Sequence, residues 1–273
     1  MLSSLLKSKP VKSTAKVGVS LFFKLYNKMK ALEDPDCKDL AELKSKLRQS
    51  KTVLNGPFKG MKYLDYNNEN GDAIYKKILG SYETELHQIT ETLAAKDYTE
   101  ILDVGSAEGY YVVGMALKNK TAKIYAYDTE EKCRALCAEL AKRNNVEDRI
   151  TLRSTLTPEK LKDFKFTGKN LIISDCEGYE KVLFNTSNLS NLSQSDILIE
   201  VHDFNDIEIS TYLKNLLSKT HNIESIYSLD DIQKAIKFNY PETNHLSLHS
   251  KRKILGEGRA SIMEWLLCTP KNN

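Results

Sequence analysis

The fold of this chain is decided by the stretch Glu100-Ile101-Leu102-Asp103-Val104-Gly105-Ser106-Ala107-Glu108-Gly109-Tyr110. Its apolar first half is typical of a buried strand, and an apolar helical segment follows from Tyr111 to Leu117. A strand that turns at glycine into a helix presents free backbone N–H groups to whatever lies in the turn. Gly105 permits a tight turn with an unusual backbone conformation, and Gly109 lets a ligand approach the backbone closely. The stretch therefore predicts a strand, a ligand-binding turn and a helix.

Asp128 follows the next predicted strand and lies 19 positions after Gly109 (128 − 109). At this place in a βαβ nucleotide-binding unit, a carboxylate accepts hydrogen bonds from ribose hydroxyls. The dinucleotide fingerprint Gly-x-Gly-x-x-Gly is not met, because Ala107 stands where its second glycine would be. The spacing indicates a nucleotide-type ligand, and an NAD-dependent dehydrogenase stays open as an alternative.

The motif Asp103-Val104-Gly105-x-Ala107-x-Gly109, followed by Tyr127-Asp128, resembles motif I and the acidic-strand motif of class I S-adenosylmethionine (SAM) methyltransferases. The resemblance implies an α/β, Rossmann-like methyltransferase fold with a mostly parallel seven-stranded sheet and helices on both faces. It also implies SAM as the cofactor. The residues that it places at the cofactor are Tyr82, Asp103, Gly105, Ser106, Glu108, Gly109 and Asp128.

The composition is that of a globular chain with one domain and additions. The chain has 273 residues, of which 41% are hydrophobic and 28% are charged. A net charge of +3 is too small to indicate nucleic-acid binding. The five cysteines are odd in number and lack metal-type spacing, so we expect a reduced, cytoplasmic setting. No apolar run is long enough for a transmembrane helix.

Strand and helix patterns alternate from Glu100 onward, which predicts a mostly parallel sheet covered on both faces. We expect a SAM-binding methyltransferase domain over residues 80–273 and an N-terminal helical extension over residues 1–79. Pro241–Gly258 is polar and resembles a linker. The predicted strands are Ile101–Val104, Lys123–Tyr127, Ile150–Arg153, Asn170–Ser174, Asp196–Val201, His221–Ser228 and Ser261–Cys268. The predicted helices are Asp39–Ser50, Tyr82–Ala94, Tyr110–Leu117, Glu130–Arg143, Pro158–Asp163, Tyr179–Phe184 and Ile209–Lys219.

The first 30 residues are basic, with seven lysines and no acidic residue, and their apolar residues recur at helical spacing. One interpretation is a helix that packs either on its own domain or on a second copy of the chain. Packing on a second copy would give a homo-oligomer. A second is an amphipathic anchor that contacts an acidic membrane surface peripherally. A third, a targeting peptide, is disfavoured because the segment contains no arginine.

Acidic residues and a histidine follow two neighbouring strands of the predicted sheet. Asp175 and Glu177 come after one apolar run, and Glu200, His202 and Asp203 end the next. Ligands of open parallel sheets bind beyond the carboxyl ends of the strands, so we expect these side chains to share one crevice. His202, whose ordinary pKa lies nearest neutrality, is the candidate general base, with Asp175 beside it.

A metal ion is one interpretation of this acidic cluster, because hard divalent cations such as Mg²⁺ take oxygen ligands. The candidate ligands are Asp175, Glu177, Glu200 and Asp203. Crowded carboxylates raise one another's pKa unless a cation intervenes, which favours a metal. In the structural alternative Asp175 caps a helix, Glu177 and Glu180 are solvated, and His202 bonds to a neighbouring carboxylate.

The string Asp175-Cys176-Glu177-Gly178 resembles the Asp-x-Glu-Gly element of FkbM-type methyltransferases, a family associated with sugar and polyketide hydroxyls. The resemblance implies O-methylation of a hydroxyl on a sugar, glycan or other small molecule, with or without a metal. Arg252 and Arg259 are candidates for binding an anionic acceptor, because guanidinium presents paired donors.

Two alternatives for the function stay open. The first is an RNA or protein methyltransferase, which only the basic N-terminus supports; nucleic acid is disfavoured because the Asn-Pro-Pro-Tyr type of element is missing. The second is a non-catalytic SAM-binding partner subunit with the N-terminal helices as its interface.

Overall fold

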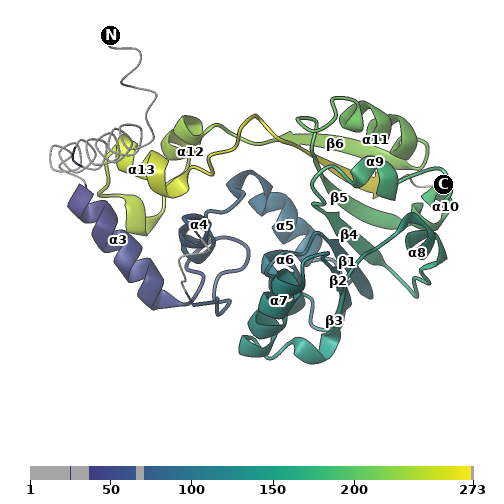
Figure 1. The fold of residues 1–273 in the computed structure, drawn as a ribbon, viewed down its shortest axis with the longest axis horizontal. Coiled ribbons are helices and arrows are strands. Elements are labelled where there is room, and N and C mark those ends of the chain that lie inside the picture. The colour runs from purple at the N-terminus through teal and green to yellow at the C-terminus, as the bar shows by residue number, and fades with distance from the viewer. Residues whose placement is uncertain (1–24, 26–36, 66–70, 272–273) are drawn as a thin grey trace, which may run out of the picture.

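Seven strands form one mixed sheet in the computed structural model, which describes Leu25, residues 37–65 and residues 71–271 (Figure 1). The strand order is β3-β2-β1-β4-β5-β7-β6. Only β7 runs antiparallel to its neighbours, β5 and β6. The predicted α/β fold with a mostly parallel seven-stranded sheet is therefore confirmed. The strands are β1 (Glu100–Val104), β2 (Lys123–Tyr127), β3 (Ile150–Arg153), β4 (Asn170–Ser174), β5 (Ser195–Val201), β6 (His221–Tyr227) and β7 (Glu264–Pro270).

The central strands are buried over their whole length. Every residue of β1, β4 and β5 is buried, which agrees with their continuous apolar runs. The bounds of β2, β3 and β4 are as predicted. β7 begins at Glu264 rather than at Ser261, because its pairing with β5 starts opposite Val201.

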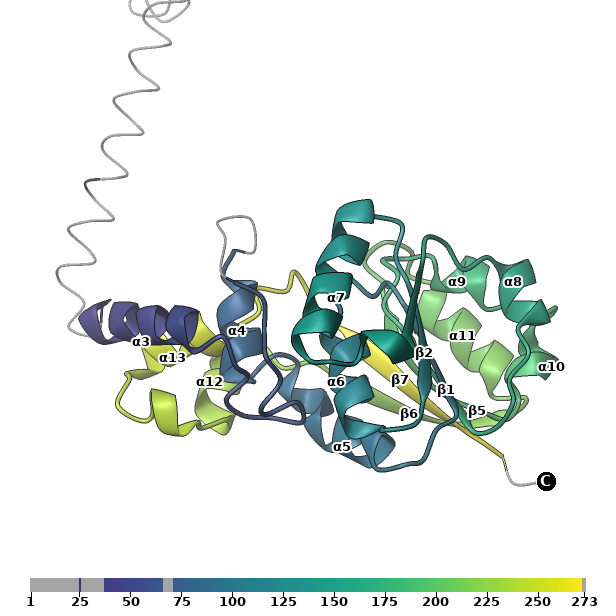
Figure 2. The same cartoon turned by 90° about the horizontal axis from the view of Figure 1, so that it is seen from below.

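Helices cover both faces of the sheet, as predicted (Figure 2). One face packs on a hydrophobic cluster that includes residues of α5 (His87–Ala94), α6 (Tyr110–Lys118) and α7 (Glu131–Arg143). The other face packs on a second cluster, and its helices are α8 (Pro158–Asp163), α9 (Glu180–Leu183), α10 (Leu189–Leu192) and α11 (Ile209–Leu217). Short 3₁₀ turns are η1 (Thr84–Leu86), η2 (Glu147–Arg149) and η3 (Pro241–Thr243).

Four further helices, which we call the helical layer, lie beside the sheet (Figure 1). They are α3 (Cys37–Ser50), α4 (Ala73–Leu79), α12 (Asp231–Lys237) and α13 (Leu248–Leu255). Leu43 and Leu47 of α3 share a hydrophobic cluster with Ile254 and Leu255 of α13, so segments far apart in sequence pack together.

Two sequence-based predictions of individual elements need correction. The supposed linker Pro241–Gly258 forms η3 and α13 and is anchored by buried Ile254 and Leu255. The predicted helix Tyr82–Ala94 is helical only from Thr84 onward and divides into η1 and α5. The boundary at residues 79 and 80 stays a prediction.

The basic N-terminal segment falls outside the described residues, apart from Leu25, so its predicted packing, membrane contact and oligomer stay predictions. Among the residues that the structure describes, no helix has the length and apolarity needed to cross a membrane.

Candidate active site

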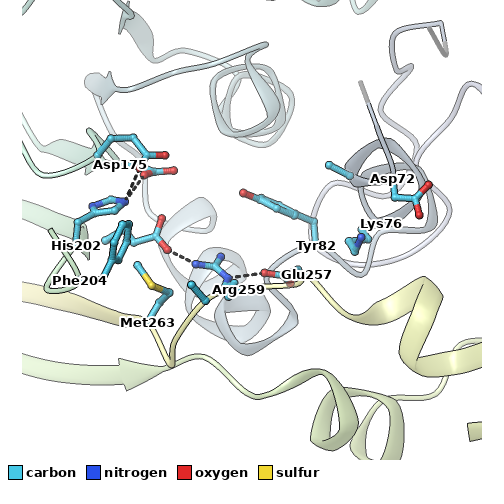
Figure 3. Close-up of a pocket in the computed structure, with 13 residues that line it drawn as sticks. Asp72, Lys76, Tyr82, Asp175, His202, Phe204, Glu257, Arg259 and Met263 are labelled. Carbon is cyan, nitrogen blue, oxygen red and sulfur yellow. Dashed lines mark hydrogen bonds and ion pairs between the residues drawn. The ribbon is translucent and has the colours of Figure 1, made fainter. Parts of the chain in front are cut away.

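Two cavities open at the carboxyl edge of the sheet, and Asp175 and Glu177 line both of them. The first, which we call the β2 cavity, has a volume of about 430 Å³ and contains Gly105 and Asp128 in its wall. The second, the β5 cavity, has a volume of about 510 Å³ and lies between the end of β5 and the helical layer (Figure 3). The predicted crevice therefore exists as two adjoining compartments.

The glycine turn after β1 is held tightly against the end of β4. Gly105 has φ +84°, and a Cβ atom added there would lie 1.6 Å from the carbonyl oxygen of Asp175. Only glycine fits this position, which agrees with the predicted tight turn. Gly109 also has a positive φ, but its added Cβ would meet Cys137 of α7 at 2.5 Å. Gly109 therefore permits the close packing of α6 on α7, and the approach of a ligand to its backbone stays a prediction.

Asp128 is a fixed carboxylate in the wall of the β2 cavity. One of its oxygens accepts a hydrogen bond from the backbone N–H of Ala107 at 2.8 Å, and the other accepts from Glu130 at 2.8 Å. Each carboxylate oxygen can accept a second hydrogen bond. The side chain is thus oriented to receive hydroxyl donors from a bound ligand, as the ribose hypothesis requires.

The other predicted cofactor residues lie outside the lining of the β2 cavity. Asp103 is buried beneath the turn, where burial, together with the charges of Asp175 and Asp128, raises its pKa to about 8. Ser106 is buried, and Glu108 pairs with Lys77. Tyr82 lines the β5 cavity instead. The sequence did not identify seven further lining residues: Ala107, Thr129, Cys133, Ser154, Thr155, Leu156 and Tyr179. Three of them, residues 154–156, could have been found, because they directly follow β3 and ligands of parallel sheets bind beyond the carboxyl ends of the strands.

His202 is held in one orientation by Glu180. Its Nδ1 lies 2.7 Å from a carboxylate oxygen of Glu180, and both side chains are buried. Because a carboxylate oxygen accepts, Nδ1 carries the proton, and Nε2 faces Asp175 at 3.4 Å and Glu177 at 3.6 Å. Glu180 was expected to be solvated in the structural alternative, and that expectation is wrong.

The surroundings of His202 favour its protonated form in the metal-free protein, and its role as a general base stays a prediction. Burial lowers the pKa of His202, but hydrogen bonds to Asp175 and Glu180 outweigh this effect and raise it to about 10. The imidazole is therefore protonated at neutral pH unless another cation replaces the proton. As an imidazolium it cannot accept a proton, so it is a general base only after that proton has left.

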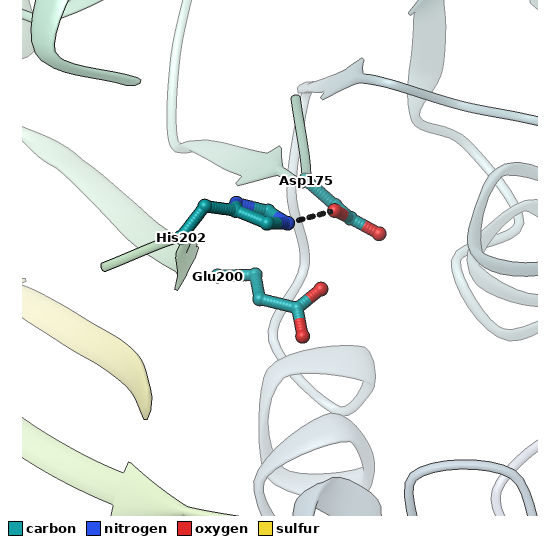
Figure 4. A group of neighbouring side chains, drawn as sticks. All are labelled: Asp175, Glu200 and His202. Carbon is teal, nitrogen blue, oxygen red and sulfur yellow. Dashed lines mark ion pairs between the residues drawn. The ribbon is translucent and has the colours of Figure 1, made fainter. Parts of the chain in front are cut away.

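Asp175, Glu200 and His202 bring one potential ligand atom each to within 4.8 Å of one another (Figure 4). One buried oxygen of Asp175, the one that lies 3.4 Å from Nε2 of His202, has no other partner in the described part of the chain. The arrangement suits a divalent cation, because Glu180 orients the histidine as second-sphere carboxylates do at metal centres. Of the other predicted ligands, Glu177 is exposed at the rim. Asp203 accepts a hydrogen bond from the backbone N–H of Ser210 at 2.9 Å.

Arg259 lines the β5 cavity, but its guanidinium is engaged by three carboxylates. Its guanidinium donates to Glu83 at 2.7 Å, to Glu257 at 2.8 Å and to Glu200. One guanidinium does not offset this much negative charge, so burial raises the pKa of Glu83 to about 7 and, with the nearby charges of Asp175 and Glu83, that of Glu200 to about 9. Arg252 is exposed and lies outside the lining of the β5 cavity.

No protein-family model matches the sequence, and no curated protein matches it. Among solved structures, an O-methyltransferase from Bacillus cereus in complex with SAH (S-adenosylhomocysteine) is similar with 11% identity and a TM-score of 0.47, over 86% of this chain and 91% of that one. The O-methyltransferase TomG from Streptomyces achromogenes, in complex with SAM, has 11% identity and a TM-score of 0.47, over 67% and 78%. A precorrin-6y C5,15-methyltransferase from Geobacter metallireducens has 10% identity and a TM-score of 0.45, over 70% and 89%. Likeness at this level is no basis for a functional assignment, and the fold assignment depends on the strand order.

Proposed function

We propose that this chain is a SAM-dependent methyltransferase that methylates a hydroxyl group of a small molecule. The observation that carries the proposal is the pair of adjoining cavities at the carboxyl edge of the sheet. One contains the glycine turn and Asp128, the other contains Glu200 and His202, and Asp175 belongs to both walls. A methyl donor in the β2 cavity and an acceptor in the β5 cavity would therefore meet at Asp175.

The β2 cavity has the features that a nucleoside ligand needs. Asp128 offers a fixed carboxylate to two neighbouring hydroxyls, and Gly105 contributes backbone alone to the wall. Thr155 and Leu156, after β3, offer a polar and an apolar contact to a base. When bound, SAM would supply a methyl group that moves from its sulfur to the acceptor oxygen as the carbon–sulfur electron pair returns to sulfur.

The acceptor proton needs a destination, and the chain provides carboxylates for it. Asp175 lines both cavities and has one buried oxygen whose partner within the described residues is Nε2 of His202, at 3.4 Å. Glu177 lines both cavities too and is 79% exposed in its side chain, so it can pass a proton to solvent. In the metal-free protein His202 is an imidazolium and orients Asp175 rather than taking the proton itself; a bound cation would replace the proton on Nε2.

A divalent cation bound by Asp175, Glu200 and His202 is part of the proposal. When bound, such a cation would lower the pKa of an acceptor hydroxyl. The mixed set of carboxylate oxygen and imidazole nitrogen favours Mn²⁺ or Zn²⁺ over Mg²⁺. The ligand set thus differs from the one that the sequence predicted, because His202 takes the place of Asp203 and Glu177.

Calorimetric titration with S-adenosylhomocysteine tests the first part of the proposal, with NAD as the competing ligand. We expect saturable binding of the former and none of NAD. Preferential binding of NAD would favour the dehydrogenase alternative. Incubation of the protein with SAM and hydroxylated sugars or sugar acids should then release S-adenosylhomocysteine; failure with every acceptor would favour a partner subunit.

Titration with Mn²⁺ followed by electron paramagnetic resonance tests the metal. We expect one site that is lost in His202→Ala and Glu200→Gln. Asp203→Asn is the matched control, because Asp203 interacts with α11 and should leave binding unchanged. Equal Mn²⁺ binding in all four proteins would remove the cation from the proposal.

A further inference from the structure

A buried lysine, Lys76, lies in the wall of the β5 cavity opposite the strand ends, and no acidic side chain forms an ion pair with it within the described residues. Lys76 belongs to α4, is 7% exposed and lines the cavity. Figure 3 shows it with Asp72 on the wall across from Asp175 and His202. Its carbonyl oxygen accepts hydrogen bonds from Gly80 and Ser81, but its ammonium group has no hydrogen bond or ion pair with any residue in the part of the chain that the structure describes.

The carboxylates around Lys76 are engaged by other cations. Asp72, one turn earlier, pairs with Lys44 at 2.9 Å. Glu257 pairs with Lys234 and Arg259. Burial lowers the pKa of Lys76, while the charges of Asp72 and Glu257 act in the opposite direction. A buried ammonium group without a partner costs free energy, which an anion bound beside it would recover.

The neighbouring lysines show that this situation is particular to Lys76. Lys77, the next residue, pairs with Glu108 beside the cofactor turn. Lys44 also has a carboxylate partner, Asp72. The other cations in the cavity wall, Arg259 and the protonated His202, each have three carboxylate partners. Within the described residues that line the β5 cavity, Lys76 is thus the cation available to a ligand.

The rest of the wall constrains the ligand further. Phe204, Ala260 and Met263 give the cavity an apolar side, and Phe204 is 56% exposed. Asp175 and Glu177 lie on the strand side, with Glu180 behind His202, so in the metal-free protein this side keeps an excess of negative charge and would repel an anion. An acceptor with one anionic group therefore has a single favourable orientation, with its anion at Lys76 and its other end at the cluster.

We infer that Lys76 is the binding residue for an anionic group, a carboxylate or a phosphate, on a hydroxyl-bearing acceptor in the β5 cavity. That the ligand is a methyl acceptor rests on the proposed function. The existence of the anion site does not. Lys76 selects acidic acceptors and fixes their hydroxyl at Asp175. It replaces Arg252 and Arg259, which the sequence suggested for this task.

Inorganic phosphate and benzoate are suitable probes, because they carry the two anionic groups without a reacting hydroxyl. Binding to the full chain is followed by NMR titration in the wild type, Lys76→Met, Lys76→Arg and Lys59→Met. Lys59 is exposed and serves as the matched control. We expect Kd values of about 1–10 mM in the wild type and a loss of about tenfold or more in Lys76→Met. Lys76→Arg should stay within about threefold of the wild type, because it keeps the charge.

The outcomes separate the two possible anions and the two proposals. Tighter binding of phosphate identifies a phosphorylated acceptor, and tighter binding of benzoate a carboxylic acid. Unchanged affinity in Lys76→Met, or no saturable binding of either probe to the wild type, would overturn the inference. S-adenosylhomocysteine is titrated into the same four proteins: retained affinity in Lys76→Met shows an intact fold, whereas no affinity in the wild type contradicts the proposed function alone.

Discussion

Glu180 and His202 form a buried hydrogen bond of 2.7 Å that decides which ring nitrogen of the histidine faces the cavity. Because Glu180 binds Nδ1, Nε2 is directed toward Asp175. The pair thus prepares a cation site, and it also explains why the metal-free histidine binds its proton so tightly.

The substitution Glu180→Gln should lower the pKa of His202 in the metal-free protein from its value of about 10. The charge of Glu180 stabilises the imidazolium, and glutamine keeps the shape of the side chain without that charge. NMR titration of the imidazole protons measures the change. Glu177→Gln is the control, since its carboxylate is exposed and lies 3.6 Å away, and it should have a smaller effect. An unchanged pKa in Glu180→Gln would contradict the orienting role.

Replacing Asp128 with alanine should weaken binding of S-adenosylhomocysteine by about 10-fold to 100-fold, which is the loss of about 1.5–3 kcal/mol expected for hydrogen bonds to a charged group. Calorimetry measures the effect. Because Asp128 also accepts backbone hydrogen bonds from Ala107 and Glu130, circular dichroism must show that the fold is kept. Asp128→Asn retains one acceptor oxygen, so its affinity for S-adenosylhomocysteine should lie between those of the wild type and Asp128→Ala. Wild-type affinity in Asp128→Ala would count against the β2 cavity as the cofactor site.

Gly105→Ala should destabilise the protein by more than about 4 kcal/mol, because the added methyl group would overlap the carbonyl oxygen of Asp175. Gly60→Ala is the control, because it introduces backbone strain without a steric clash. Gly60 also has a positive φ, +91°, but no atom lies within 4 Å of its added Cβ, so only about 1–2 kcal/mol is expected. Urea unfolding gives both values, and similar losses in the two variants would contradict the close approach of the turn to β4.

Protein stability should fall as the pH rises from about 6 to about 9, the reverse of ordinary acid unfolding. The folded-state pKa values of Glu83, Glu200 and His202, about 7, 9 and 10, lie above their ordinary values. The folded protein therefore binds more protons than the unfolded chain, and the stabilisation is lost as the pH rises through those values.

Denaturant unfolding of the metal-free protein at several pH values checks this trend. Glu83→Gln should flatten the part of the curve between about pH 5 and pH 7, because it removes the titrating carboxyl group. Glu139→Gln, which changes an exposed partner of Arg143, should leave the curve as it is. Stability that rises steadily over the whole range would show that Arg259 neutralises its carboxylates fully.

The sheet was predictable because its central strands are continuous apolar runs between turn residues. β4 and the positions of Asp175 and Glu177 after it follow from that pattern alone. α12 and α13 were missed because they are short and polar, and their stability comes from packing on distant segments. No pattern in the local sequence indicates packing on distant segments.

The partners within the site were less predictable than its location. Arg259 and Glu83 are 176 positions apart, and nothing near either residue indicates their ion pair. Lys76 and Lys77 are adjacent and chemically identical, yet one faces a cavity and the other a carboxylate. Glu180 resembles any exposed helix residue in sequence, but the fold buries it against His202.

The two compartments have different origins in the chain. Residues at the ends of β1 to β4 enclose the β2 cavity. The far side of the β5 cavity comes from α4 and from the segment between α13 and β7. Substitutions or exchanges in those two peripheral segments can therefore alter which compound is modified while the donor-binding half stays constant. Relatives with the same sheet but different helices here should differ in the molecule they recognise, and transplanting both segments together is the rational route to a new specificity.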